Sequence, residues 1–117
     1  MGAFTLDVQT QGKRLVLVTH GYVDDTAATK LIAAVDTHLG AGGNQVILDL
    51  TDSKVVASPG LAGILDICIK VVDDQQGRLV ICGLDKMKEN VFAMASIFQY
   101  AEKTQTLAEA AALLGAG

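Results

Sequence analysis

Apolar and polar residues alternate at the start of the chain. Phe4, Leu6 and Val8 are separated by polar neighbours, which is the period of a half-buried β-strand. The pair Gly12-Lys13 is suited to a turn, and an apolar run from Leu15 to Val18 follows it. The pattern therefore predicts that the chain begins with a β-hairpin.

After the hairpin, segments with helical spacing alternate with short apolar runs. Asp24 or Asp25 is suited to cap a helix whose apolar stripe ends at Leu39, and the glycine-rich residues 40–43 then form a C-cap and loop. The elements predicted beyond this loop are a buried strand at 46–48, a helix that begins at Ser58, a buried strand at 79–82, a helix capped by Asp85 that extends to Phe98, an edge strand at 103–105 and a last helix at 107–114 that starts with a Thr106-to-Glu109 capping box.

This order of elements predicts an α/β fold with a mixed sheet of about four to five strands and helices packed against it. A length of 117 residues fits a single domain over 1–117, large enough to bury a core without disulfides or metals. Right-handed crossovers would bring Asp24-Asp25, residues 49–58 and residues 83–85 to one edge of the sheet. That edge is where a functional site is expected.

The segment at 46–65 carries the most specific signal in the chain. A buried strand ends in acidic loop residues, and a helical period opens at Ser58-Pro59. A serine before proline is suited to N-capping, because its side-chain oxygen accepts an unpaired backbone N–H and proline at N1 needs no acceptor. Capping alone explains a serine here, although the same helix end could also hold a phosphate group.

The segment resembles the STAS domain family, whose pattern is a strand ending in Asp-Leu, a short loop, and Asp-Ser-x-Gly-Leu opening a helix. Five residues match this pattern, namely Asp49, Leu50, Ser58, Gly60 and Leu61. Ala57 stands where the family usually has aspartate, and Pro59 follows the serine. The resemblance implies that Ser58 is the phosphorylation site of a partner that is both anti-sigma factor and serine kinase. It also implies that the unphosphorylated chain binds this kinase and so releases the sigma factor.

Composition excludes several other classes of protein. A formal net charge of −4 and nine scattered basic residues argue against nucleic-acid binding. No apolar run reaches the about 20 residues that cross a bilayer, and the N-terminal residues lack the pattern of a secretory signal. We therefore expect no membrane insertion and a cytoplasmic location. Cys68 and Cys82 lack metal-ligand spacing and are predicted as buried, reduced thiols.

The sequence contains no recognisable catalytic constellation, so the predicted protein is not an enzyme and has no cofactor or metal. His20 and His38 belong to no HxH or HExxH motif and have no cysteine neighbour, and each is predicted as a surface or hydrogen-bonded core histidine. Asp49 and Asp52 could form a magnesium or acid/base pair, but carboxylates in such a loop more often form turns. The stripe containing Met87, Val91, Met94, Ala95 and Phe98 has helical spacing and is predicted as core.

The predicted partner surface combines the edge of the sheet with the outer face of the Ser58 helix. The apolar stripe of this helix is expected to face the core, which would leave its two interior glycines and one isoleucine outside. The predicted partner-binding residues are therefore Asp24, Asp25, Ser53, Ala57, Pro59, Gly60, Gly63 and Ile67.

The predicted partners are the anti-sigma kinase and a phosphatase that reverses the modification, and the oligomeric state is left open. One alternative is a phosphorylation-independent STAS scaffold or a subunit of a larger signalling or transport assembly, with Ala57 and Pro59 marking loss of the switch. A second alternative is a domain that binds a small ligand at the acidic edge.

Overall fold

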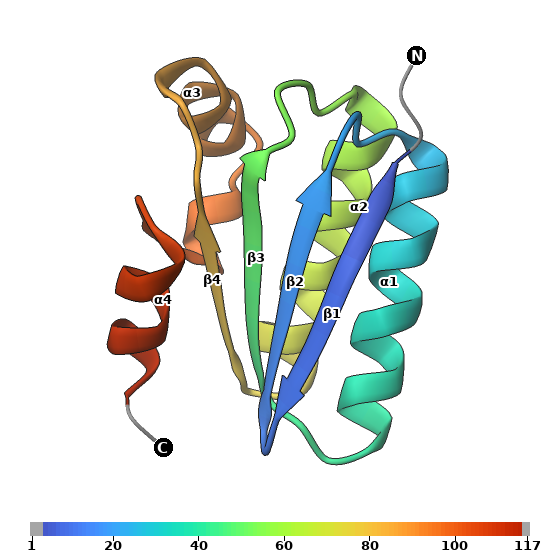
Figure 1. Ribbon diagram of the computed structural model, residues 1–117, viewed down its shortest axis with the longest axis vertical. Helices are drawn as coiled ribbons and strands as arrows, with labels where there is room; N and C mark the ends of the chain where they lie inside the picture. The colour runs from blue at the N-terminus through green and yellow to red at the C-terminus, as the bar shows by residue number, and fades with distance from the viewer. Residues whose placement is uncertain (1–3, 116–117) are drawn as a thin grey trace.

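The computed structural model describes residues 4–115 and builds them around one five-stranded sheet (Figure 1). Its strands lie in chain order, with β1 antiparallel to β2 and the others parallel. The strands are β1 (Thr5–Gln11), β2 (Arg14–His20), β3 (Gln45–Asp52), β4 (Arg78–Cys82) and β5 (Glu102–Thr104). The predicted α/β fold with a mixed sheet and an N-terminal hairpin is confirmed.

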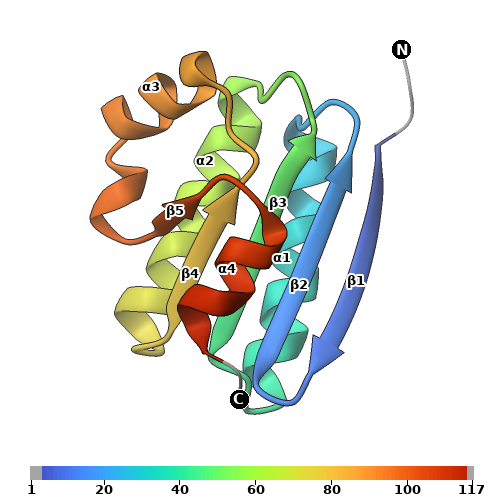
Figure 2. The same ribbon diagram turned by 60° about the vertical axis from the view of Figure 1, so that its left-hand side comes forward.

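Helices cover both faces of this sheet. The helical elements are α1 (Asp25–Gly40), α2 (Ser58–Cys68), a π-helical segment (Ile69–Asp74), α3 (Lys86–Met94), a 3-10 turn (Ile97–Gln99) and α4 (Leu107–Leu114). α1 and α2 lie side by side on one face, whereas α4 crosses the opposite face (Figure 2). Because β2 to β5 are parallel, their carboxyl ends share one edge of the sheet, as the predicted crossovers require.

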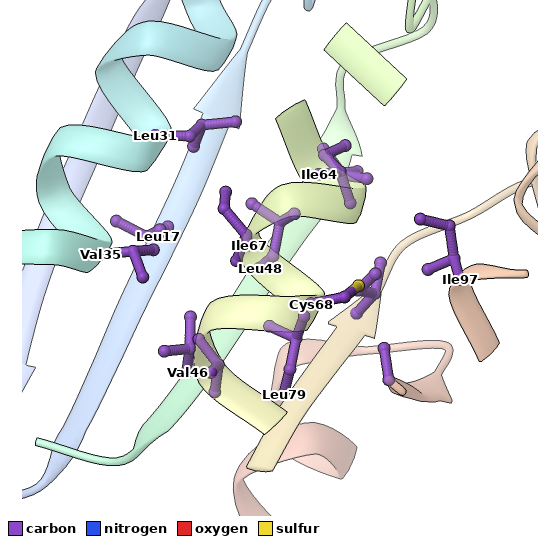
Figure 3. Close-up of a cluster of buried hydrophobic side chains, with 14 of the residues drawn as sticks. Leu17, Leu31, Val35, Val46, Leu48, Ile64, Ile67, Cys68, Leu79 and Ile97 are labelled. Atoms are coloured by element: carbon purple, nitrogen blue, oxygen red, sulfur yellow. The ribbon is translucent and has the colours of Figure 1, made fainter. Parts of the chain in front are cut away.

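Two hydrophobic clusters, one on each face, hold these layers together. The larger cluster lies between the sheet and helices α1 and α2, and includes Leu17, Leu48 and Cys68 (Figure 3). The smaller cluster packs α4 onto the other face and includes Cys82. Because the two cysteines belong to different clusters, they remain free thiols, and burial raises the pKa of each to about 12.

Helix α2 packs against α1 through small residues. A Cβ atom on Gly63 would lie 2.5 Å from the Cβ of Ala28, and one on Gly60 would lie 2.3 Å from the carbonyl oxygen of Val23. Ile67 is buried in the larger cluster (Figure 3). The prediction that Gly60, Gly63 and Ile67 face outward is therefore wrong. Helix α2 is apolar around most of its circumference, so sequence periodicity alone could not identify its buried side.

Helix α3 also differs from the predicted arrangement. Met87 and Met94 are 75% and 86% exposed and Val91 is also exposed, so this part of the predicted stripe is not core, whereas Ala95 and Phe98 pack against the larger cluster. Phe92 is fully buried instead and anchors the helix. Ser96 adopts a left-handed conformation with φ of 66°, which ends the helix before the predicted Phe98. Phe92 lies on the opposite side of α3 from Met87 and Met94, so its burial turns both methionines to solvent.

Side-chain caps fix the starts of three helices. The carboxylate of Asp24 accepts the Ala27 N–H at 2.9 Å, and that of Asp85 accepts the Lys88 N–H at 2.8 Å. At α4, Thr106 and Glu109 form the predicted capping box. These caps confirm the predicted helix starts, with Asp24 rather than Asp25 as the cap of α1.

Candidate functional site

The loops that follow β2, β3 and β4 converge at the carboxyl edge of the sheet. The Val23 N–H donates to the Val55 carbonyl at 3.0 Å, and the Ala57 N–H donates to the Val23 carbonyl at 2.9 Å. These bonds form a parallel bridge between the loop before α1 and the loop before α2. The Lys88 ammonium of α3 reaches the Lys54 carbonyl at 3.3 Å. The predicted gathering of these loops at one edge is therefore confirmed.

Ser58 is the first helical residue of α2, and its side chain is exposed. Ala57 is the N-cap, with extended backbone angles and no side-chain cap bond. The prediction that Ser58 caps the helix is wrong, because α2 begins one residue earlier than expected and places Pro59 in the first turn after the serine. Within the described residues the Ser58 hydroxyl makes no hydrogen bond, so it is free to react or to contact a partner.

The N-terminus of α2 presents backbone donors beside this hydroxyl. The first bond within the helix runs from the Leu61 N–H to the Ala57 carbonyl at 2.9 Å. The earlier N–H groups of Ser58 and Gly60 have no acceptor within the helix, and Pro59 has none to donate. The positive end of the helix dipole lies at the same place. An anion attached to Ser58 would meet both.

A β-bulge in β3 shapes the approach to this helix. Between the paired positions Val18–Asp49 and His20–Asp52, β3 has one residue more than β2. The Asp49 carboxylate accepts the backbone N–H and the hydroxyl of Thr51 at 3.0 and 2.6 Å, and so stabilises the bulge. Asp49 is therefore a turn-forming residue, as the sequence favoured.

Ser53 lies inside this turn rather than on the surface. Its side chain is fully buried, with its hydroxyl oxygen 2.6 Å from that of Thr19. Thr19 donates its own proton to the Asp49 carbonyl, so Ser53 is the donor in the bond between the two hydroxyls. The placement of Ser53 on the exposed partner surface is therefore contradicted, because its hydroxyl satisfies a buried network.

His20 at the end of β2 lies between two carboxylates. Its Nδ1 is 2.6 Å from Asp52 Oδ2, and its Nε2 is 2.9 Å from Asp7 Oδ2. The hydrogen bond to Asp52, followed by that to Asp7, raises the pKa of His20 above its usual 6.5. No motif in the sequence indicates this cluster. Only the strand register, which pairs His20 with Asp52, could have indicated it.

The other predicted surface residues occupy the same edge. Asp25 and Pro59 are exposed, whereas Asp24 and Ala57 are partly buried. The exposed side chains of Tyr22 and Val55, which the sequence did not single out, belong to the loops before α1 and α2 at the same edge. Tyr22 and Val55 line a shallow hollow of about 250 Å³, together with Gly21, Asp52 and Lys54.

A larger hollow of about 610 Å³ lies beside α3 at the ends of β4 and β5. Its charged groups are paired, with Lys103 3.0 Å from Glu89 and Lys88 2.9 Å from Asp85. The side-chain bond from Lys88 lowers the pKa of Asp85. Within residues 4–115 no group of three metal-ligating side chains could hold a metal ion.

Gly83 brings the β4–α3 loop against the β3 bulge. Its φ is +81°, and a Cβ there would lie 2.5 Å from the Thr51 nitrogen. We expect Gly83→Ala to lower the free energy of unfolding by about 1–3 kcal/mol, because the side chain adds both backbone strain and overpacking. Urea denaturation measures this. Gly40→Ala is the matched control, since Gly40 has ordinary φ and no atom near its Cβ position, and equal stability of the two variants would contradict the prediction.

Together, the sheet, its two helical faces and the loop edge define a compact α/β domain with an exposed helix-terminal serine. The sequence profile of the STAS domain matches residues 5–110, and the chain belongs to this family. No curated protein sequence matches the chain significantly. No helix among residues 4–115 is long and apolar enough to cross a membrane.

Solved structures with the same fold include anti-sigma factor antagonists. One from Mycobacterium paratuberculosis has a TM-score of 0.80 and 15% identity, covering 95% of this chain and 93% of that chain. The antagonist SpoIIAA from Bacillus, in its unphosphorylated form, has a TM-score of 0.75 and 18% identity, with coverage of 97% and 99%. The Thermotoga maritima protein TM1081 has a TM-score of 0.79 and 18% identity, with 92% coverage of each chain. These likenesses establish the shared fold.

Proposed function

We propose that the protein is a phosphorylation-switched binding domain that acts as an anti-sigma factor antagonist. The exposed, unbonded hydroxyl of Ser58 at the start of α2 is the observation that carries this proposal. SpoIIAA, which shares the fold, has been solved in both unphosphorylated and phosphorylated forms. In its unphosphorylated form the chain binds a kinase-type anti-sigma factor in the cytoplasm and releases the sigma factor.

The helix end around Ser58 suits it to carry a phosphate without unfolding. A phosphoserine adds about −1.5 to −2 charge, which the Gly60 N–H and the helix dipole stabilise. Tyr22 and Val55 provide apolar contact area on the same edge for a partner protein. A partner that covers this area would meet a bulky dianion after phosphorylation, so the bound and modified states exclude each other. A phosphatase then restores binding.

Phosphotransfer to Ser58 is the direct test. The purified protein is incubated with ATP, magnesium and a panel of purified anti-sigma kinases from the same organism, and modified residues are identified by mass spectrometry. We expect one phosphate on Ser58 and none on a Ser58→Ala variant. Because Ser58 makes no cap bond, this variant should keep its stability within about 0.5 kcal/mol. Modification at Thr51 or Ser53 instead would contradict the assignment.

A phosphorylation-independent scaffold is the second candidate. Ala57, which stands where the family usually has aspartate, offers no carboxylate beside the acceptor hydroxyl. If no kinase in the panel modifies Ser58, and wild type and Ser58→Ala bind the same partner equally well, the scaffold function replaces the switch.

A further inference from the structure

The cluster of His20, Asp7 and Asp52 has a geometry that specifies the charge of the histidine. Each ring nitrogen lies within hydrogen-bond distance of a different carboxylate, at 2.6 Å to Asp52 and 2.9 Å to Asp7. A neutral imidazole carries one N–H, whereas a carboxylate only accepts. Both bonds therefore form together only with the imidazolium, in which both nitrogens donate.

Asp52 connects this cluster to the loop that carries Ser58. The backbone carbonyl of Asp52 accepts the N–H of Gly21, the residue that follows His20, at 3.1 Å. The following residues, through Ala57, are tied to Val23 by the parallel bridge, and Ser58 comes next. On the other side, Asp7 belongs to β1, the edge strand of the sheet. The imidazolium thus joins the edge strand β1 to the last residue of β3, from which the Ser58 loop leaves the sheet.

We propose that His20 is a positioning residue for the Ser58 loop, and that its protonation makes phosphorylation and partner binding depend on pH. The inference rests on the proposed function for its biological readout. When His20 loses a proton, one of the two carboxylates faces a ring lone pair, and that bond is lost. Residues 52–58 then lose an attachment to the sheet, and Ser58 is presented in a wider range of positions.

The direction of the effect follows from the surroundings of the ring. Asp52 from β3 and Asp7 from β1 are the charged groups that act on His20, and both raise its pKa. A raised pKa in the folded state stabilises the fold most below about pH 6.5, and this contribution disappears as pH rises through the folded pKa. The loop should therefore be most ordered in mildly acidic solution and least ordered above that pKa.

Nuclear magnetic resonance of the unliganded protein tests the positioning step without any partner. We expect the His20 ring to titrate above about pH 6.5, and the amide signals of residues 53–58 to shift with the same midpoint. Asp52→Asn should lower the His20 midpoint more than Asp7→Asn, because the bond to Asp52 is the larger cause of the shift. If the amide signals of residues 53–58 do not shift with the midpoint of the His20 titration, the proposal is overturned.

The functional step is tested with the kinase that modifies Ser58. Phosphorylation rates of wild type and His20→Gln are compared across the same pH range, so that the pH dependence of the kinase cancels in their ratio. We expect wild type to react several-fold faster at about pH 6 and the two rates to converge above the His20 pKa. A constant ratio would overturn the proposal. Failure of every kinase to modify wild type would instead contradict the proposed function, and the NMR result would still decide the loop's dependence on His20.

Discussion

Replacing Gly63 with arginine is expected to lower the free energy of unfolding by about 3 kcal/mol or more, because overpacking and a buried charge act together. Even the Cβ atom of the new side chain would lie 2.5 Å from the Cβ of Ala28, in the contact between α1 and α2. Urea denaturation followed by circular dichroism gives the size of the loss.

Ala62→Arg is the matched control, because Ala62 is the neighbouring residue on α2 and its side chain is exposed. This variant should unfold at nearly the wild-type urea concentration. If Gly63→Arg matched it, the close packing of the two helices would be refuted. Ala62, rather than Gly63, is also the position at which added bulk can test contact between α2 and a partner without disturbing the fold.

Phosphorylation of Ser58 is expected to weaken binding of the anti-sigma kinase roughly hundredfold, because charge placed wrongly in an interface costs several kcal/mol. Titration calorimetry without ATP compares the phosphorylated and unmodified proteins directly. Lys13→Ala is the control variant, because Lys13 lies in the β1–β2 turn at the opposite edge of the sheet, and it should leave the affinity unchanged. Equal affinity of phosphorylated and unmodified protein would show that Ser58 lies outside the interface.

The sequence predicted the fold because each element carries its own local signal. Alternation in β1, short apolar runs in β3 and β4, and the Thr106–Glu109 capping box each depend on residues close together in the chain. Crossover handedness then placed the loops at one edge without any knowledge of side-chain contacts. For the same reason, the position of Ser58 at the start of a helix could be predicted.

Features that depend on contacts between elements could not be predicted in this way. The burial of Gly60 and Gly63 depends on the approach of α1, and the exposure of Met87 depends on the burial of Phe92 on the opposite side of α3. Ser58 was predicted as the N-cap of α2 but is its first helical residue, because the helix begins one residue earlier than the local pattern indicates. The His20 cluster joins three strands, and its register depends on an unpredicted bulge.

The burial of Cys68 and Cys82 on the two faces of the sheet determines how the protein can be labelled. Thiol reagents attack the thiolate, and a thiol whose pKa is raised to about 12 is almost entirely protonated in neutral buffer. A cysteine introduced at the exposed position of Val55 would therefore react with a fluorescent maleimide far faster than either native thiol. The wild-type background thus allows a dye to be attached beside Ser58 without first removing the natural cysteines.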